Sequence, residues 1–153
     1  MKIRPSIVLQ KDNAVLLMQY HYNNNERLNL PGGNLEEGET MAQSLVREMH
    51  EELGIEVQIH KLLFVGEVVS SAQKTTLHCV FAGTIVNGIP QLNPAETTAE
   101  ALVWLPAEQL LTINLYPNIA QKLYLHLHKK QTPSTYVGQI EQEWFWLVVN
   151  YKL

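Results

Sequence analysis

Hydrophobic residues in the first half of the chain alternate in short runs and then recur at helical spacing. Two apolar or β-branched runs, residues 3–9 and 14–20, flank a polar turn and predict a pair of strands. The stretch 21–27, with three consecutive asparagines, is typical of a loop. The residues between Thr40 and Gly54 include neither Gly nor Pro and place apolar side chains on one face, so they predict a helix with Thr40 as its cap.

The second half of the chain shows a similar alternation of extended and helical patterns. It predicts, in order, two strands (55–69 and 75–86), a loop (89–98), a strand (101–105), a short helical segment (107–111) and a helix (118–128). The last stretch, 136–151, mixes aromatic and apolar residues without a clear period. Alternating strands, two main helices and no linker-like tract indicate a single α/β or α+β domain with a mixed sheet over residues 1–153.

Composition and charge narrow the classes of function. The chain has 153 residues, 46% of them hydrophobic and 17% charged, which is ordinary for a globular domain and excludes a disordered or disulfide-stapled protein. Its net charge of −4 argues against a broad basic face for nucleic acid. No apolar run reaches the length of a membrane helix or a signal-peptide core, and the single cysteine, Cys79, lies in an apolar stretch. We therefore expect a cytoplasmic protein with no nucleic-acid or membrane partner.

Half of the glutamates are concentrated in one short segment. Seven of the fourteen lie within residues 36–56, where Arg47 is the one Lys or Arg. On a helix, Glu48 lies beside both Glu51 and Glu52, and like charges at such spacings destabilise a helix by about 0.2–0.5 kcal/mol per pair. A hard divalent cation such as Mg²⁺ reverses the sign of this effect. A solvated helix face is the alternative, but the glycines on either side suit a tight loop close to a ligand and favour the metal site.

This segment resembles the Nudix box, in which glycines and glutamates recur at fixed spacing around an Arg-Glu pair. Nine positions match the pattern: Gly33, Glu39, Arg47, Glu48, Met49, Glu51, Glu52, Gly54 and Ile55. The box covers residues 33–55, and the remainder of the chain fits the family's outline more loosely. The resemblance implies an α/β/α sandwich around a mixed β-sheet, in a single domain. It also implies a hydrolase that cleaves a pyrophosphate bond in a nucleoside diphosphate linked to another moiety, with Mg²⁺ or Mn²⁺.

The resemblance assigns roles to individual box residues. Glu48, Glu51 and Glu52 are similar to the family's metal-binding carboxylates. Arg47, four positions before Glu51, can hold a carboxylate in place by a bidentate pair. Glu39 and Arg47 are similar to the pair that braces the loop-helix-loop.

The proton acceptor for the attacking water has several candidates. Within the box, Glu51 or Glu52 is expected to take the proton. Some members of the family instead use a glutamate from a later loop, where this chain has Glu96 and Glu100.

Substrate contacts are expected near the start of the box and at nearby aromatic residues. A backbone carbonyl of Gly32 or Gly33 would add a metal ligand, the bare backbone there can approach substrate, and Arg27 can meet a phosphate. Four side chains are candidates for stacking on a base: Tyr20, Tyr22, Trp104 and Trp144. The markers of the ADP-ribose, diadenosine polyphosphate and coenzyme A groups are missing, so the nucleotide stays open.

Two classes of function are compatible with such a box: an enzyme, and a catalytically silent module that binds a nucleotide or regulates. Silent modules commonly lose box glutamates or carry a DNA-binding domain. Here every box carboxylate is present, and the single-domain prediction uses all 153 residues, which favours the enzyme. The expected partner is a small nucleotide. Dimers are common in the family, so the resemblance is also compatible with a homodimer.

Overall fold

Residues 1–129 and 134–142, which the computed structural model describes, form eight strands, two α-helices and one short 3₁₀ helix. In chain order they are β1 (Lys2–Lys11), β2 (Ala14–Tyr22), β3 (Asn25–Asn29), α1 (Met41–Leu53), β4 (Glu56–Val69), β5 (Thr75–Asn87), β6 (Ala101–Pro106), η1 (Ala107–Thr112), β7 (Leu115–Tyr116), α2 (Ala120–Leu127) and β8 (Tyr136–Gln139).

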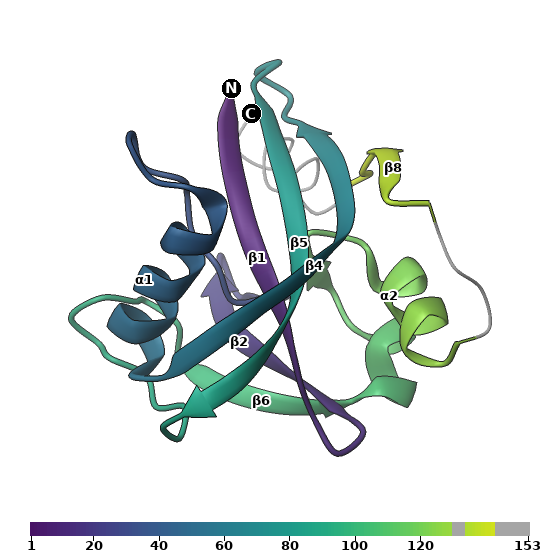
Figure 1. Cartoon of the computed structure of the whole chain (residues 1–153). Helices are drawn as coiled ribbons and strands as arrows, with labels where there is room; N and C mark the ends of the chain where they lie inside the picture. Colours follow the sequence, from purple (N-terminus) through teal and green to yellow (C-terminus); the bar gives the residue numbers. More distant parts are fainter. Residues whose placement is uncertain (130–133, 143–153) are drawn as a thin grey trace.

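The strands form one mixed sheet with a helix on each side (Figure 1). The strand order is β7-β3-β2-β1-β5-β4-β8, and β6 pairs with β2 outside this path. Strand β1 is antiparallel to β2 but parallel to β5, so the sheet changes direction at its centre. The predicted α/β fold, a mixed sheet between helices in a single domain, is confirmed.

The core is divided into two clusters because side chains of a strand point alternately to opposite faces. In β1, Ile7 and Leu9 belong to the cluster under α1, whereas Val8 belongs to the cluster that includes Leu123 of α2. Helix α1 contributes most of the expected apolar stripe, with Leu45, Met49 and Leu53 all fully buried, but Val46, also expected on that face, is 45% exposed. Each fully buried side chain contributes about 1.5–3 kcal/mol of hydrophobic stabilisation.

Both ends of α1 are fixed by local hydrogen bonds. The Thr40 hydroxyl accepts from the Gln43 amide at 3.2 Å, and the Gln43 side chain accepts from the Thr40 amide at 2.9 Å, which completes a capping box. At the other end Gly54 adopts φ 64°, a left-handed conformation that favours glycine, and its amide donates to the His50 carbonyl. The predicted helix bounds are confirmed, and the acidic side chains of the helix are thereby held at defined positions.

The predicted loop at residues 21–27 is wrong, because the chain forms a hairpin there. Strand β2 continues to Tyr22 and β3 begins at Asn25, so the turn consists of Asn23 and Asn24. Both turn residues have positive φ values, 50° and 65°, which Asn tolerates better than most residues. The hairpin projects beyond the core, and residues 21–26 are exposed on both faces. Their polarity therefore carried no alternation that could predict strands.

The strands and helices predicted in the second half of the chain are present, although the ends of some differ by one or two residues. The strands predicted at 55–69, 75–86 and 101–105 are β4, β5 and β6, and the short helical segment is the 3₁₀ helix η1. The second helix begins two residues later than predicted, at Ala120. Of the unassigned stretch, residues 136–139 form β8, and positions from 143 onward lie outside the described residues. Within the described residues, the helices are too short or too polar to cross a membrane.

The loop that opens the Nudix box lies directly on β1. The Ile7 amide donates to the Pro31 carbonyl at 2.9 Å, the Gly33 amide to the Pro5 carbonyl at 3.3 Å, and the Leu35 amide to the Ile3 carbonyl at 2.8 Å. These hydrogen bonds hold residues 31–35 against the N-terminal half of β1. A side chain at Gly32 would overlap the β1 backbone, so the close approach requires glycine.

Candidate active site

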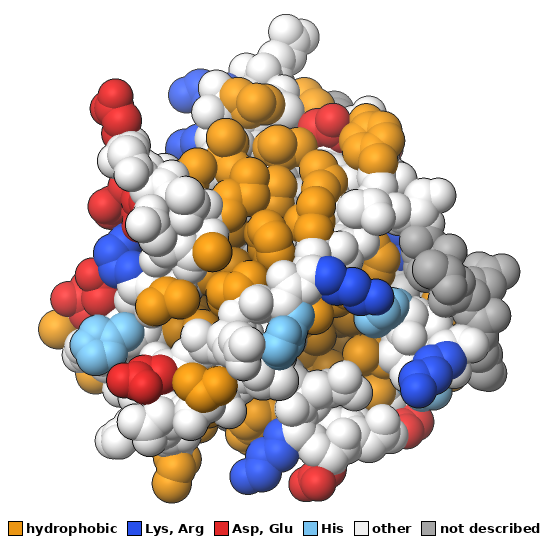
Figure 2. Space-filling model, in the orientation of Figure 1, with side chains coloured by type: hydrophobic (Ala, Val, Ile, Leu, Met, Phe, Trp, Pro, Cys, Tyr) orange, Lys and Arg blue, Asp and Glu red, His pale blue; other side chains and the backbone are white. Residues whose placement is uncertain are grey.

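Arg47 of α1 is the centre of an ionic network that joins the box loop to the helix. Its Nε donates to Glu39 Oε2 at 3.0 Å and its Nη2 to Glu39 Oε1 at 2.8 Å, a bidentate contact between the two residues that the resemblance gives as a bracing pair. Its Nη1 donates to Glu48 Oε1 and to Glu51 Oε2, both at 3.2 Å. The hydrogen bond from Arg47 holds the pKa of Glu39 below its ordinary value. Figure 2 shows this acidic side of α1 along the left edge of the molecule.

Glu48 and Glu52 differ from Glu51 in their burial. The Glu48 side chain is 14% exposed and that of Glu51 is 38% exposed. Burial raises the pKa of Glu48, and burial together with the charge of Glu48 raises the pKa of Glu52 to about 7. Oxygen Oε2 of Glu52 is buried and has no hydrogen-bond partner. Two neighbouring carboxylates, one with an orphaned oxygen, are costly to bury unless a proton or a cation compensates them.

These carboxylates fit a hard divalent cation. Among the described residues no three His, Cys, Asp or Glu side chains already form a metal-binding group. Arg47 donates to one oxygen each of Glu48 and Glu51. Mg²⁺ needs only one or two protein carboxylates, since waters and substrate phosphates complete its octahedral shell. The orphaned oxygen of Glu52 beside Glu48 supplies donors of this kind.

Gly33 leaves room for the Glu48 carboxylate, because a Cβ at position 33 would overlap it. We expect Gly33→Ala to displace this carboxylate and lower metal-dependent turnover by about 10- to 100-fold, the range seen when groups that orient metal ligands are lost. A metal titration of kcat/KM measures this effect. Gly38→Ala is the matched control in the same loop: Gly38 has φ 86° with nothing near its Cβ position, so only backbone strain follows. Equal losses in the two variants would contradict this role of Gly33.

The loop over residues 89–98 holds the C-terminal turn of α1. The Asn93 side-chain amide donates to the Glu51 carbonyl at 3.1 Å, its backbone amide donates to the Glu52 carbonyl at 2.9 Å, and the Gln91 amide donates to the Leu53 carbonyl at 3.0 Å. The orphan carbonyls at the helix end are thus satisfied by a distant loop. Sequence reasoning missed Asn93, since its partner lies 42 positions earlier and no local pattern indicates the contact.

The two later-loop glutamates occupy different surroundings. Glu96 belongs to the turn that starts at Asn93, whose carbonyl accepts from the Glu96 amide at 2.9 Å. The Glu100 carboxylate instead contacts the imidazole of His21 in β2. Glu96 therefore belongs to the turn anchored to the end of α1, whereas Glu100 is engaged by the hairpin.

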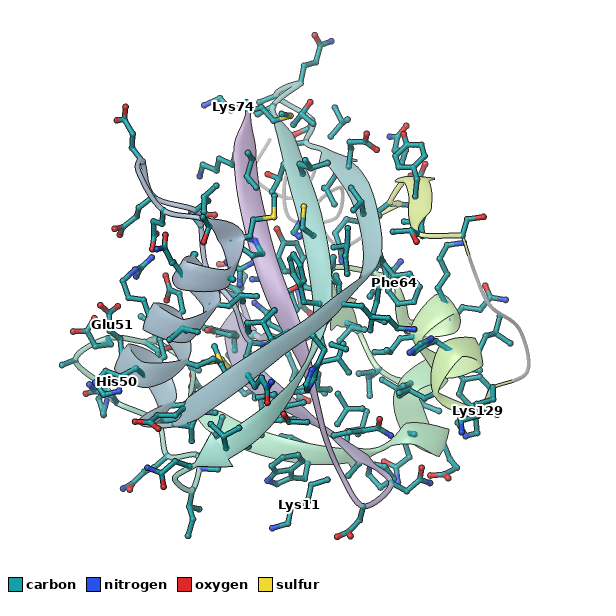
Figure 3. All side chains as sticks on the ribbon, in the orientation of Figure 1. Lys11, His50, Glu51, Phe64, Lys74 and Lys129 are labelled. Atoms are coloured by element: carbon teal, nitrogen blue, oxygen red, sulfur yellow. The ribbon has the colours of Figure 1, made fainter. Side chains whose placement is uncertain are left out.

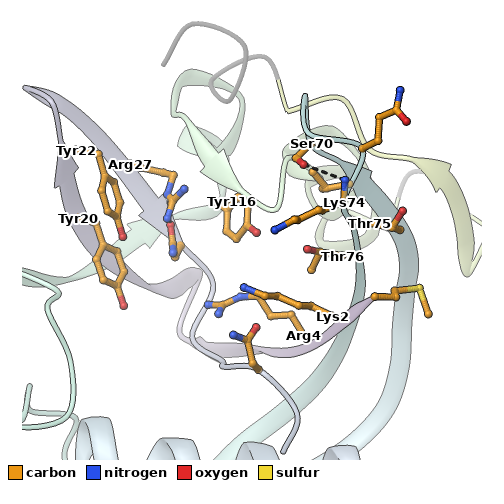
Figure 4. A pocket seen from close by; sticks show the side chains of 15 residues that line it. Lys2, Arg4, Tyr20, Tyr22, Arg27, Ser70, Lys74, Thr75, Thr76 and Tyr116 are labelled. Carbon is orange, nitrogen blue, oxygen red and sulfur yellow. Dashed lines mark hydrogen bonds between the residues drawn. The ribbon is translucent and has the colours of Figure 1, made fainter. Parts of the chain in front are cut away.

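A cavity of about 1030 Å³ opens beside the box (Figure 4). Tyr20, Tyr22, Arg27 and Tyr116 of β7 line one side of it, and Arg27 lies between the rings of Tyr22 and Tyr116. The rings of Tyr20 and Tyr22 are nearly parallel, with centroids 6.0 Å apart. Asn34 of the box loop also lines the cavity, and it directly follows Gly33, which lies against the Glu48 carboxylate.

Arg27, the predicted phosphate contact, is 8% exposed in the cavity wall. Its guanidinium lies 4.6 Å from the Tyr22 ring centroid and 4.4 Å from that of Tyr116, and its Nε donates to Asn29 Oδ1 at 2.9 Å. Burial lowers its pKa. These contacts hold a cation rigidly at the wall of the cavity.

The aromatic candidates divide into three groups. Tyr20 and Tyr22 line the cavity as expected. Trp104 of β6 instead packs against the hydrophobic cluster under α1 and does not line this cavity, so its stacking on a base stays a prediction. Trp144 lies outside the described residues. Tyr116 was missed, since it belongs to a two-residue strand that has no pattern of its own.

The described residues that line the cavity include Lys2, Arg4, Arg27 and Lys74 but no Asp or Glu. A cationic cavity therefore lies beside an acidic helix face, an arrangement suited to an anionic ligand that is also bridged by cations. Sequence reasoning missed Arg4, although its spacing from Lys2 places both side chains on one face of a strand.

A mixed sheet between two helices, with the box carboxylates held on α1, is the arrangement expected of a Nudix hydrolase. The NUDIX domain model matches residues 3–127, and the chain belongs to this family.

Similar proteins include enzymes that act on nucleotides. The chain is 30% identical over 127 residues to the oxidized purine nucleoside triphosphate hydrolase of Mus musculus, covering 82% of this chain and 78% of that protein. It is 31% identical over 118 residues to the CTP pyrophosphohydrolase of Escherichia coli K12, covering 72% and 79%. The solution structure of the E. coli ORF135 protein superposes with a TM-score of 0.71 at 23% identity, covering 88% of this chain and 95% of that one.

Proposed function

We propose that this Nudix hydrolase cleaves a pyrophosphate bond of a nucleoside triphosphate in a reaction that depends on Mg²⁺ or Mn²⁺. The observation that carries the proposal is the placement of Glu48 and Glu52, buried and partly unpaired, beside a cavity lined by tyrosines and cations. A nucleotide matches this arrangement, since its base can stack on aromatic rings while its phosphates face the box. The two relatives named for nucleoside triphosphates support the choice of substrate.

Glu48 and Glu52, with the carbonyl of Gly32 or Gly33, would hold the cation. Bound there, a divalent cation would supply neutralisation of phosphate charge and make water more acidic. Glu51 would share this carboxylate face, and Arg47, through its contacts with Glu48 and Glu51, would hold their side chains in place.

A box glutamate would take the proton of the attacking water. We assign this role first to Glu51, because its side chain is 38% exposed, against 14% for Glu48, and it can therefore reach a water molecule. Glu52 and the later-loop glutamates Glu96 and Glu100 are the alternatives. The water oxygen bonds to phosphorus, the bridging P–O bond breaks, and the departing phosphate retains the electron pair.

A hydrolysis screen tests the proposal. Purified protein is incubated with Mg²⁺ or Mn²⁺ and with the common and oxidised nucleoside triphosphates, UDP-glucose and ADP-ribose, and the products are separated by chromatography. We expect a nucleoside monophosphate and pyrophosphate from a triphosphate, with turnover lost on addition of EDTA. Silence across the panel, from folded protein that binds metal, would contradict the proposal and favour a nucleotide-binding module.

The remaining expectations concern the molecule's surroundings and assembly. A cytoplasmic location accords with a nucleotide substrate, and we retain it as part of the proposal. The extent of the domain, residues 1–153, stays a prediction, and so does the homodimer. Size-exclusion chromatography with light scattering measures the assembly directly.

A further inference from the structure

Arg4 is a partly buried cation that forms no ion pair among the described residues, although its charge acts at longer range on Glu48 and Glu52 of α1. Among the described residues no ion pair or hydrogen bond to its guanidinium is found, and its Nε is buried and unpartnered. The guanidinium carbon of Arg4 lies 5.8 Å from the centroid of the Tyr116 ring, a cation–π contact. A guanidinium has five donors in a fixed fork, so leaving it unpaired in a partly desolvated place is unfavourable.

The strand beneath the box loop directs Arg4 into the cavity. The carbonyls of Ile3 and Pro5, on either side of Arg4, accept hydrogen bonds from the box loop. The side chain of Arg4 lines the cavity, and its positive charge lowers the pKa of Glu48 and of Glu52. Arg4 is therefore placed between the carboxylates of α1 and the tyrosines of the cavity.

The strand next to β1 supplies no counter-charge for Arg4. Its register partner on β5 is His78, which is fully buried with both ring nitrogens unpaired. Burial lowers the pKa of His78 to about 4, so this imidazole is neutral at pH 7.

Two lysines extend the positive charge around Arg4. Lys2 precedes it by two positions in β1 and pairs in register with Thr76 of β5. Lys74 ends the turn between β4 and β5, where its amide donates to the Ser70 hydroxyl at 3.2 Å and its carbonyl accepts from the Ser70 amide at 2.9 Å. Figure 4 shows Lys2, Arg4 and Lys74 facing the cavity, opposite Tyr20 and Tyr22.

We propose that Arg4, with Lys2 and Lys74, forms a phosphate subsite for the part of the substrate's phosphate chain that the box carboxylates do not hold. The inference rests on the proposed function and deepens it, because it requires a chain longer than one phosphate. A phosphate offers the Arg4 fork paired oxygen acceptors and offers the lysines a counter-charge. A neutral sugar at this place would leave Arg4 unpaired, so the subsite selects nucleoside triphosphates over nucleotide sugars.

Binding of phosphate chains without a base tests the subsite directly. The dissociation constants of inorganic tripolyphosphate and of orthophosphate are measured by calorimetry in Mg²⁺ for the wild type, Arg4→Gln and Arg4→Lys. We expect Arg4→Gln to weaken tripolyphosphate binding by about 10- to 100-fold, the usual effect of losing a charge-assisted hydrogen bond, and to change orthophosphate binding by less than about 3-fold. Arg4→Lys should restore part of the loss, since it keeps the charge without the fork.

The control is Lys11→Gln, a change of the same charge at the opposite end of β1. Figure 3 shows Lys11 at the bottom of the molecule and Lys74 at the top. This variant should bind tripolyphosphate like the wild type. The melting temperature of Arg4→Gln should change little, because removing a partly desolvated charge and losing its attraction to Glu48 and Glu52 have opposite effects on stability. A lower melting temperature with equal loss of both ligands would show a structural role and overturn the proposal.

The remaining outcomes separate this inference from the proposed function. EDTA-sensitive hydrolysis by the wild type together with normal tripolyphosphate binding by Arg4→Gln would overturn the subsite alone. Tight, Arg4-dependent binding of tripolyphosphate without hydrolysis of any nucleotide would support the subsite and overturn the enzyme. Absence of tripolyphosphate binding to the folded wild type would overturn the subsite.

Discussion

Glu52→Gln is expected to reduce turnover by about 100- to 10,000-fold, which corresponds to the several kcal/mol that a bound cation contributes to charge stabilisation. The substitution removes one charge from the buried Glu48–Glu52 pair at nearly constant shape, so the proposed cation loses a ligand. Steady-state kinetics with Mg²⁺ and with Mn²⁺ measure the loss. Glu56→Gln, at an exposed position of β4 just after the box, is the matched control and should retain activity. Wild-type turnover in Glu52→Gln would remove Glu52 from the metal site.

Although Glu52→Gln is expected to lower turnover, it is expected to raise the free energy of unfolding of the metal-free protein, measured in EDTA. Burial raises the pKa of Glu52 to about 7, above the ordinary value of 4.5, so the native protein binds more protons than the unfolded chain between these pH values. The free energy of unfolding therefore falls as pH rises from about 4.5 to 7. The glutamine side chain of the variant cannot ionise, so we expect Glu52→Gln to exceed the wild type by about 1–3 kcal/mol at pH 8 and to match it near pH 4. Thermal melts across this pH range check the sign.

Arg47→Ala is expected to lower both stability and activity. It removes the bidentate partner of Glu39 and the contacts to Glu48 and Glu51, and leaves these carboxylates facing one another. The Arg47 side chain is 27% exposed, so solvent weakens the effect. We expect a loss of about 2–3 kcal/mol in the free energy of unfolding, below the roughly 3–5 kcal/mol of a fully buried pair. Denaturant titration measures it.

The Arg47→Lys variant separates the catalytic effect of the positive charge of Arg47 from that of its planar guanidinium. Arg47→Lys keeps the positive charge but has no planar fork, so it should recover part of the stability while turnover stays at least about tenfold below the wild type. Loss of turnover in Arg47→Ala with unchanged stability would instead indicate that Arg47 contacts the substrate.

Local patterns were sufficient to predict α1, whereas the Arg47–Glu39 pair followed from the resemblance to the Nudix box. The helix has a cap, a terminal glycine and an apolar stripe within its own sequence, and its ends followed from them. The hairpin at residues 21–27 could not be predicted in this way, because alternation indicates a strand only where one face is buried. The polar asparagines there have no buried face, so tertiary pairing alone reveals the strands.

The cavity escaped prediction for a different reason. Its lining comes from β1, the β2–β3 hairpin, the β4–β5 turn and β7, which are far apart in sequence. A net charge of −4, summed over the whole chain, conceals the local excess of Lys2, Arg4, Arg27 and Lys74. The Asn93 contact with the end of α1 is likewise long-range. The box thus predicts the acidic half of the candidate site, while the cationic half emerges only from the fold.

The position of the acidic residues along α1 has a further consequence. Glu51 and Glu52 lie in the last turn of a helix that ends at Leu53, where the macrodipole presents its negative end and carboxylates are disfavoured by about 0.3–1 kcal/mol each. A cation held there would interact favourably with the dipole as well as with the side chains. The negative charges of Glu51 and Glu52 therefore destabilise the last turn of α1 when no cation is bound. Occupation of the proposed metal site would strengthen the very turn that carries it.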